Sequence, residues 1–409
     1  MAAADTVREQ RAAIAVDGRL IALLLVGAMT IMAGATISPS LPAIEREVAT
    51  GENTALLTRL VLTVPALFTV LTGLVAGATL DRFGRRRILL AAIVLYALAG
   101  PAGGLMSNVW ALLATRALLG VAVGIVMTAS VTLVTDYYAG PQRGEVMGRQ
   151  AAFAGIGGIV FLVGGGLLAD LSWRAPFAIY LLALPVLVMA WRFLPEPSRA
   201  AAADHDDGGI MRRGPVALLA MLAFTSMVVF YLTPVQIPFH LEALGAPSGT
   251  LAGIAVASTT LTGAVASALY GRVRARLARS LVFAVLFAPM AAGYAIVALA
   301  AGPALVIAGL AIFGMGFGLL IPNLNTLAGD LATDATRGTV IGTLTTSLFL
   351  GQFASPLVAQ PVIERFGSAG AFGAGAAVLA ALAIGFAVAN RPGGARSGTG
   401  PASASASVK

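Results

Sequence analysis

The chain has 409 residues, of which 58% are hydrophobic and only 11% are charged. One soluble core cannot bury that much apolar surface, so the composition predicts a polytopic membrane protein. The excess of 26 Lys and Arg over 18 Asp and Glu does not indicate a nucleic-acid surface, because the charges fall between the hydrophobic runs. The absence of cysteine excludes disulfides and thiolate metal sites.

A polar segment, residues 1–19, precedes a first apolar run from Leu20 to Ile37. This run could pass for a signal peptide cleaved near Ala33-Gly-Ala35, but it is long for one and eleven further runs follow it. Windows of roughly 18 or more apolar residues predict membrane helices. The twelve predicted spans are residues 20–40, 57–79, 88–106, 109–134, 147–169, 176–194, 215–237, 251–270, 281–301, 304–328, 340–362 and 369–389.

The arginines predict how these spans are oriented. If the N-terminus is cytoplasmic, the inner loops hold most of them, and the outer side has only Arg46, Arg59, Arg174 and Arg365. Because positive residues are retained on the cytoplasmic side, we expect both termini to lie there. The predicted parts are a cytoplasmic segment (1–19), a six-helix bundle (20–194), a flexible cytoplasmic hinge (195–214), a second six-helix bundle (215–389) and a disordered cytoplasmic tail (390–409).

The two halves repeat each other at a constant offset of 194 residues. Gly120 and Gly124 correspond to Gly314 and Gly318, Asp136 to Asp330, and Arg143-Gly-Glu-Val-Met-Gly148 to Arg337-Gly-Thr-Val-Ile-Gly342. A parallel duplication explains this pattern. Two homologous bundles in the same orientation place a substrate pathway between them, near the midplane.

A polar, arginine-dense island separates the second and third apolar runs: Gly77-Ala-Thr-Leu-Asp81-Arg82-Phe-Gly84-Arg85-Arg86-Arg87. It predicts a tight cytoplasmic turn. The island resembles the loop 2–3 signature of the major facilitator superfamily, whose plan fits roughly residues 18 to 390. Further stretches similar to motifs of that family are Arg116-x-x-Leu-Gly120-x-x-x-Gly124, Ser172-Trp-Arg174-x-Pro-Phe177, Leu194-Pro-Glu-Pro197 and Leu320-Ile-Pro322-Asn323-x-Asn325. The resemblance implies an all-α membrane fold of twelve transmembrane helices, in two six-helix bundles related by pseudo-two-fold symmetry.

The resemblance also implies a gate, formed by Gly77, Asp81, Arg82, Gly84, Arg85 and Arg86. Asp81 is expected to face the N-terminal end of helix 11, near Gly338 to Gly342, while the cytoplasmic side is closed, because helix N-termini favour a carboxylate. Gly77 would let helices 2 and 11 approach closely. The alternative is a topological anchor whose charges stay in water. The counterpart in the second half, Gly271-Arg-Val-Arg-Ala-Arg276, has no carboxylate, so the gate hypothesis rests on Asp81.

Four residues are candidates for proton coupling: Arg116, Asp136, His240 and Glu242. Arg116 lies roughly 10 Å inside helix 4, where a permanent charge is costly. Resemblance to proton-driven exporters implies coupling through it; clamping of helix 1 carbonyls and anion binding are the alternatives. Asp136 could instead pair with Arg143 or cap a helix, and His240 could sense external pH or be a polar interfacial residue. No carboxylate lies centrally in any predicted span, and the helix 5 antiporter motif lacks its proline.

Aromatic and amide residues at mid-span positions are candidates for substrate contacts. They are Phe153, Phe161, Phe224, Phe230, Tyr231, Gln236, Asn323, Asn325, Phe349 and Gln352. A site that is mostly apolar, with a few amides and one phenol, suits an amphipathic solute better than a sugar. The alternative for each residue is helix packing or contact with lipid.

The sequence contains no phosphate loop, no Rossmann fingerprint and no histidine–acid pair at ligand spacing inside a span, so we expect no cofactor and no metal. It predicts a monomeric, non-enzymatic secondary transporter of the bacterial inner membrane, with a small molecule, protons and lipid as partners and no nucleic acid. Proton-coupled export of an amphipathic compound or drug is the first hypothesis, implied by resemblance to efflux branches. The alternatives are an uncoupled facilitator or importer of a metabolite, and a non-transporting sensor or scaffold.

Overall fold

The computed structural model describes residues 16–48, 51, 53–197, 213–333 and 335–389. The apolar runs are helical, as lipid requires of a backbone that must satisfy its own hydrogen bonds. The first half contains α2 (Gly18–Ala35), η1 (Ser38–Ser40), α3 (Leu41–Glu47), α4 (Thr54–Phe83), α5 (Arg85–Ala102), η2 (Gly103–Leu105), α6 (Val109–Tyr137), α7 (Gly140–Leu171), η3 (Ala175–Leu182) and α8 (Ala183–Phe193). The second contains α9 (Arg213–Phe230), α10 (Leu232–Ala243), α11 (Gly249–Arg276), α12 (Arg279–Ala298), α13 (Pro303–Leu331) and α14 (Arg337–Ala389).

The described residues form eleven continuous helical runs that are long and apolar enough to cross a membrane. The last run, α14, has 53 residues, and its backbone is not helical at Gly367, where φ is 70°. A straight helix of that length would be about 80 Å long, far more than a hydrocarbon core of roughly 30 Å. The left-handed backbone at Gly367 therefore divides α14 into two spans, and the prediction of twelve spans is confirmed. The hinge, 195–214, lies mostly outside the described residues, and the tail, 390–409, lies wholly outside them.

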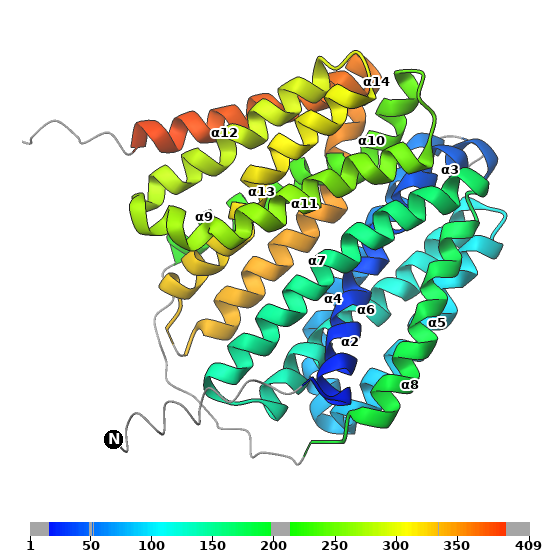
Figure 1. Cartoon of the computed structure of the whole chain (residues 1–409), viewed down its shortest axis with the longest axis vertical. Coiled ribbons are helices and arrows are strands. Elements are labelled where there is room, and N and C mark those ends of the chain that lie inside the picture. Colours follow the sequence, from blue (N-terminus) through cyan, green and yellow to red (C-terminus); the bar gives the residue numbers. More distant parts are fainter. Residues whose placement is uncertain (1–15, 49–50, 52, 198–212, 334, 390–409) are drawn as a thin grey trace, which may run out of the picture.

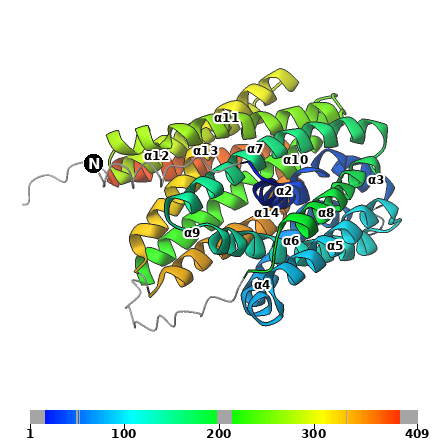
Figure 2. The same ribbon diagram turned by 60° about the horizontal axis from the view of Figure 1, so that its bottom comes forward.

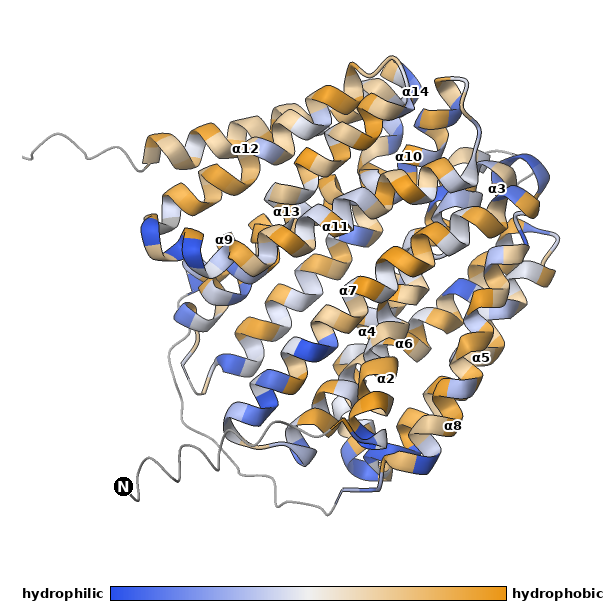
Figure 3. Ribbon diagram, viewed as in Figure 1, coloured by the Kyte–Doolittle hydropathy of each residue, from blue (hydrophilic) through white to orange (hydrophobic). Residues whose placement is uncertain are grey.

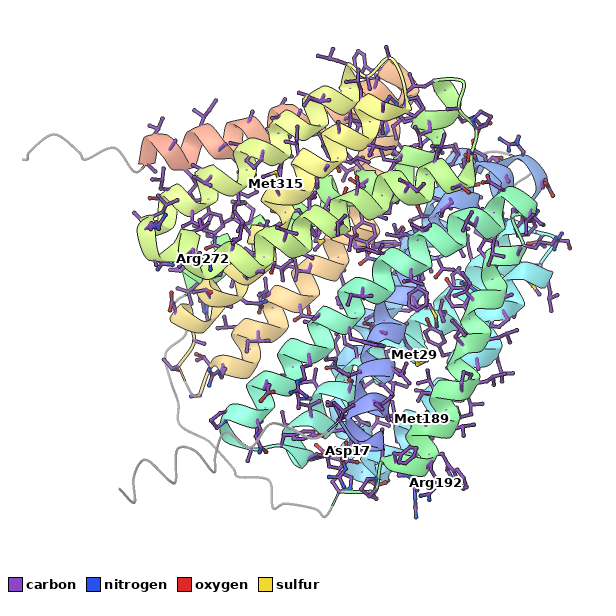
Figure 4. The ribbon with its side chains drawn as sticks, viewed as in Figure 1. Asp17, Met29, Met189, Arg192, Arg272 and Met315 are labelled. Atoms are coloured by element: carbon purple, nitrogen blue, oxygen red, sulfur yellow. The ribbon has the colours of Figure 1, made fainter. Side chains whose placement is uncertain are left out.

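Polar residues gather where helices end (Figure 3), which gives the molecule two distinguishable ends. We call the end that holds the turn at Gly84 the arginine-rich end and the end that holds Gly245 and Gly367 the opposite end. Asp17 and Arg192 lie at the arginine-rich end of the first half, and Arg272 lies at that end of the second (Figure 4). Asp17 caps α2 there by accepting a hydrogen bond from the amide of Leu20 at 2.8 Å.

Each half has its own apolar core. One cluster of buried residues runs from Leu20 to Leu194 and includes Val235 of the second half. The other runs from Val216 to Ala383 and includes Leu162 of the first half. Figure 2 shows the two groups of helices side by side, with α7 of the first half running beside α11 of the second. Val235 and Leu162 each pack into the core of the other half, so they mark where the bundles meet.

The repeat is visible in how glycines let helices approach. A Cβ on Gly120 of α6 would overlap the carbonyl oxygen of Pro65 in α4, and a Cβ on Gly314 of α13 would overlap that of Thr259 in α11. Gly120 and Gly314 are 194 positions apart in the sequence, and so are Pro65 and Thr259. The same helix pair is therefore packed in the same way in both bundles, as a parallel duplication requires.

Candidate functional site

The island at residues 77–87 is folded back onto the first bundle. Gly84 has φ of 96°, a conformation that favours glycine. The carboxylate of Glu196, just after α8, accepts hydrogen bonds from the amides of Arg85 at 2.6 Å and Arg86 at 3.3 Å, so it caps the N-terminus of α5. The side chain of Arg86 donates to the carbonyl of Trp191 at 2.6 Å. The Leu194-Pro-Glu-Pro197 segment thus anchors the turn.

The guanidinium of Arg85 joins two carboxylates. It pairs with Asp81 of α4 at 3.2 Å and with Asp136 at the end of α6. The expectation that Asp136 pairs with Arg143 is wrong, because Arg143 instead donates to the carbonyls of Thr135 and Tyr138 at the end of α6. The guanidinium of Arg82 lies over the ring of Phe83, 5.2 Å from its centroid.

The glycines expected to allow a close approach of helices 2 and 11 at this end lie in open space. A Cβ added at Gly77, Gly338 or Gly342 would meet no atom of the described residues within 4 Å, so no described helix packs closely at these glycines. The Asp81 side chain is 67% exposed. The gate was expected to open when the bundles separate at this end, and its role stays a prediction.

Arg116 is fully buried inside the first bundle. Its Nη2 donates to the carbonyls of Ala99 and Gly100 at 2.9 and 2.6 Å, where α5 gives way to η2, and its guanidinium lies about 5 Å from the ring centroids of Phe177 and Tyr180. A clamp on backbone carbonyls and a role in proton coupling were alternatives for Arg116 in the sequence analysis. The structure contains such a clamp, but its carbonyls belong to helix 3 and not to helix 1. Among the described residues, no carboxylate forms an ion pair with Arg116.

His240 is also buried, and both of its ring nitrogens have partners. Nε2 donates to the carbonyl of Val297 at 3.1 Å, and Nδ1 forms a hydrogen bond with the hydroxyl of Ser368 at 2.9 Å. The ring therefore ties α10 to the end of α12 and to the bend in α14. These contacts support a structural role for the ring, and the role of a pH sensor stays a prediction.

The two bundles are joined at the opposite end by polar contacts, which we call the seam. Glu242 of α10 pairs with Arg46 of α3, and Ser38 donates to the carbonyl of Pro234 at 2.5 Å. Gln236 of α10 accepts from Nε of Arg59 at 3.3 Å. Glu242 is thus the coupling candidate whose ion-pair partner lies in the other bundle. A cavity of about 170 Å³ lies on the seam between these contacts and is lined by both bundles.

Close packing of α7 against α11 completes the seam. A Cβ on Gly249 would lie 2.7 Å from the carbonyl oxygen of Gly166, and one on Gly253 would overlap that of Leu162. Toward the arginine-rich end the two helices diverge (Figure 1), and Cβ atoms added at Gly148 and Gly155 of α7 would meet nothing within 4 Å. The bundles are therefore held together at one end and separate toward the other.

The predicted substrate contacts are only partly brought together. Phe230 contacts Tyr231, with ring centroids 5.5 Å apart, and stacks on Phe317 of α13 at 3.8 Å. Tyr231 reaches the first bundle, where its hydroxyl would lie 3.6 Å from a Cβ on Gly34. Gln236 is instead fully buried in the seam.

The other candidates are scattered. Asn323 is buried and accepts from the hydroxyl of Tyr270 at 3.2 Å, while its amide nitrogen has no partner among the described residues. Phe153 and Asn325 are exposed; the half-buried candidates are Phe161, Phe224, Phe349 and Gln352.

Sequence reasoning missed three residues at these sites. Phe317 follows Phe313 by four positions, so both rings lie on one face of α13, and this spacing was a usable signal. Arg59 is the third residue of a predicted span, so the cost of a buried charge was a weaker signal for it than for Arg116, although the structure buries both. Asp170 had no signal, because its partners are 78 to 80 residues away in sequence.

Twelve apolar helices in two duplicated bundles that meet at one end define the class of secondary transporters. The sequence matches the profile of the Major Facilitator Superfamily over residues 23–356, with an overlapping second match over 234–405. The chain therefore belongs to this family.

Two relatives and one solved structure illustrate the similarity. The chain is 30% identical to the puromycin resistance protein pur8 of Streptomyces alboniger over 195 residues, which is 46% of this chain and 37% of that protein. It is 27% identical to the multidrug efflux pump SdrM of Staphylococcus aureus, over 47% of this chain and 43% of that one. Each match spans less than half of the relative's length. The fold is similar to that of a D-xylose–proton symporter, with a TM-score of 0.77, 17% identity and coverage of 90% of this chain and 96% of that one.

Proposed function

We propose that this protein is a proton-coupled exporter of a small amphipathic compound, working by alternating access in the bacterial inner membrane. The observation that carries the proposal is its sequence similarity to a puromycin resistance protein and a multidrug efflux pump. The proposed unit is a monomer of two bundles, residues 20–194 and 215–389. The hinge at 195–214 joins them, and both termini are cytoplasmic.

The contacts of the seam support the assignment of this conformation to one state of the transport cycle, the state that is open at the arginine-rich end. Polar contacts and glycine packing join the bundles at the opposite end, whereas α7 and α11 diverge toward the arginine-rich end. If the arginine-rich end is cytoplasmic, as the positive-inside rule predicts, this conformation faces the cytoplasm. An exporter would load its substrate in this state.

Aromatic stacking supports an amphipathic substrate. Phe230, Phe317 and Tyr231 place two rings and a phenol near the contact between the bundles. Flat, apolar faces with few polar groups bind an aromatic or amphipathic solute through area, while the phenol fixes its orientation.

Among the coupling candidates, Glu242 has the strongest support. Its partner, Arg46, belongs to the other bundle, so protonation of Glu242 would remove an ion pair that spans the seam. Arg116, Asp136 and His240 are each engaged within one bundle. An uncoupled facilitator or importer stays the second candidate, because the carboxylates of the described spans lie near helix ends and not at mid-membrane.

The test is transport by purified protein in liposomes that contain a pH-sensitive dye. Puromycin is the first probe, and amphipathic cations, amphipathic anions and sugars follow under inward and outward proton gradients. Proton movement on addition of puromycin or another amphipathic compound supports the proposal. Flux that ignores the gradient supports the facilitator, and no flux with any probe leaves the non-transporting sensor or scaffold.

A further inference from the structure

The carboxylate of Asp170 crosses from one bundle to the other at the opposite end. It lies at the end of α7, in the first bundle, and its oxygens accept from the amide of Gly249 at 2.6 Å and from the amide and hydroxyl of Thr250 at 3.1 and 2.5 Å. The hydroxyl of Ser248 donates to it as well, at 3.3 Å. All of these donors belong to the first turn of α11, in the second bundle.

This contact provides hydrogen-bond acceptors for the backbone amides at the beginning of α11, a helix of 28 residues. Ser248 is the N-cap of α11, and its side chain accepts from the amide of Leu251. Asp170 accepts hydrogen bonds from the amides of Gly249 and Thr250, the two residues before Leu251. The first turn of a helix has unpaired N–H groups and a partial positive charge, so a carboxylate is well placed there.

We infer that Asp170 is a latch that holds the opposite end closed and releases when the bundles part there. The inference rests on the proposed alternating-access function. Two features support it independently of the hydrogen bonds. The backbones of Gly166 and Gly249 touch beside the carboxylate, so any rocking of the bundles must separate these two groups. Asp170 is also exposed, so water can replace its partners at modest cost when the seam opens.

The latch has the same chemistry as the gate expected at the arginine-rich end. There, Asp81 of the first bundle is predicted to face the beginning of α14 in the second. Here, Asp170 of the first bundle faces the beginning of α11. In alternating access by rocking of two bundles, closing one contact opens the other, so each carboxylate would stabilise one of the two end states.

The experiment measures the conformational equilibrium directly and needs no substrate. The chain has no cysteine, so cysteines at the exposed positions Leu171 and Ala243 can carry spin labels on the first and second bundles. The distance between the labels is measured by pulsed electron resonance in nanodiscs. Asp170→Ala should raise the ratio of separated to close populations about tenfold, as expected from loss of charge-assisted hydrogen bonds, and Asp170→Asn should raise it less.

A matched control comes from the other end of the first bundle. Asp17 also caps a helix through its carboxylate, but its partner, Leu20, lies in the same helix. Asp17→Ala should therefore leave the distance distribution unchanged. The latch is overturned if folded Asp170→Ala and Asp170→Asn both give the wild-type distribution. A shifted distribution in protein that transports none of the probes would support the latch and count against the proposed function instead.

Discussion

Arg59 of the first bundle donates from Nε to Oε1 of Gln236 in the second bundle, at 3.3 Å. The guanidinium is almost completely buried, with its Nη1 bound to the carbonyl of Ala55 at 2.6 Å and to the carboxylate of Glu45 at 3.3 Å. It also lies 4.4 Å from the ring centroid of Phe239. One side chain thus joins the two bundles with directed donors and a ring contact.

The geometry predicts that Arg59→Lys is not a conservative change. A lysine keeps the charge but cannot reach Gln236, Glu45 and a backbone carbonyl with one planar group. We expect normal membrane insertion and transport reduced about tenfold or more, from loss of roughly 1.5–3 kcal/mol of charge-assisted hydrogen bonding that selects the closed seam. Initial rates of probe efflux from proteoliposomes measure this. The same change at Arg149, which pairs with Glu145 on an exposed helix face, should have little effect; equal rates for Arg59→Lys and Arg149→Lys would contradict the prediction.

The charge chain Asp81–Arg85–Asp136 leads to a second prediction. Asp81→Asn should leave the protein inserted and folded but slow transport, because the arginine-rich end would close less firmly without its carboxylate. Rates are measured in reconstituted vesicles. Glu145→Gln removes an acid from the same end without touching the island and serves as the control. Unchanged transport by Asp81→Asn would remove the gate role and leave the topological anchor.

Arg116 provides a third prediction, which separates a clamp from a coupling residue. Arg116→Ala would leave the carbonyls of Ala99 and Gly100 without these donors in a buried site, at a cost of about 3 kcal/mol in unfolding stability. We expect a lower melting temperature in detergent and a lower yield of folded protein. Proton flux induced by the probe, measured per folded molecule, should survive. Its loss in a stable, folded variant would restore the coupling role.

The number and order of the spans could be predicted from the sequence because lipid imposes them locally. A run of apolar residues must become a helix in a membrane, wherever its neighbours lie. The bend at Gly367 also fell within the short polar gap between the last two predicted spans, residues 363–368. The repeat at offset 194 was correctly assigned for a similar reason, since the glycines that mark it serve packing within each bundle.

The contacts between the bundles could not be predicted, because they depend on which faces two distant helices present to each other. Asp170 finds its partners in a helix that begins 79 residues later, and Gln236 finds Arg59 across 177 positions. One alternative paired Asp136 with Arg143, the nearest arginine in the sequence, but the fold brings Arg85 to it. A sequence shows which charges are costly to bury, but only the packed helices show which groups compensate them.

The approach of α11 to α7 leads to a fourth prediction. A Cβ on Gly253 would overlap the backbone carbonyl of Leu162, which cannot move as a flexible side chain could. Gly253→Val should therefore wedge the seam apart, favour the state that is open at the opposite end and close the arginine-rich end. A cysteine at Ala151, an exposed α7 position two turns before Gly158 and on the same helix face, reports this through its rate of alkylation by a maleimide added on the arginine-rich side. We expect Gly253→Val to slow the labelling of this cysteine about fivefold or more, because the bulky side chain separates α11 from α7. Gly155→Val is the matched control, because a Cβ there meets nothing within 4 Å. If both valines change the alkylation rate to the same extent, crowding of the labelled site, and not the seam, would explain the result.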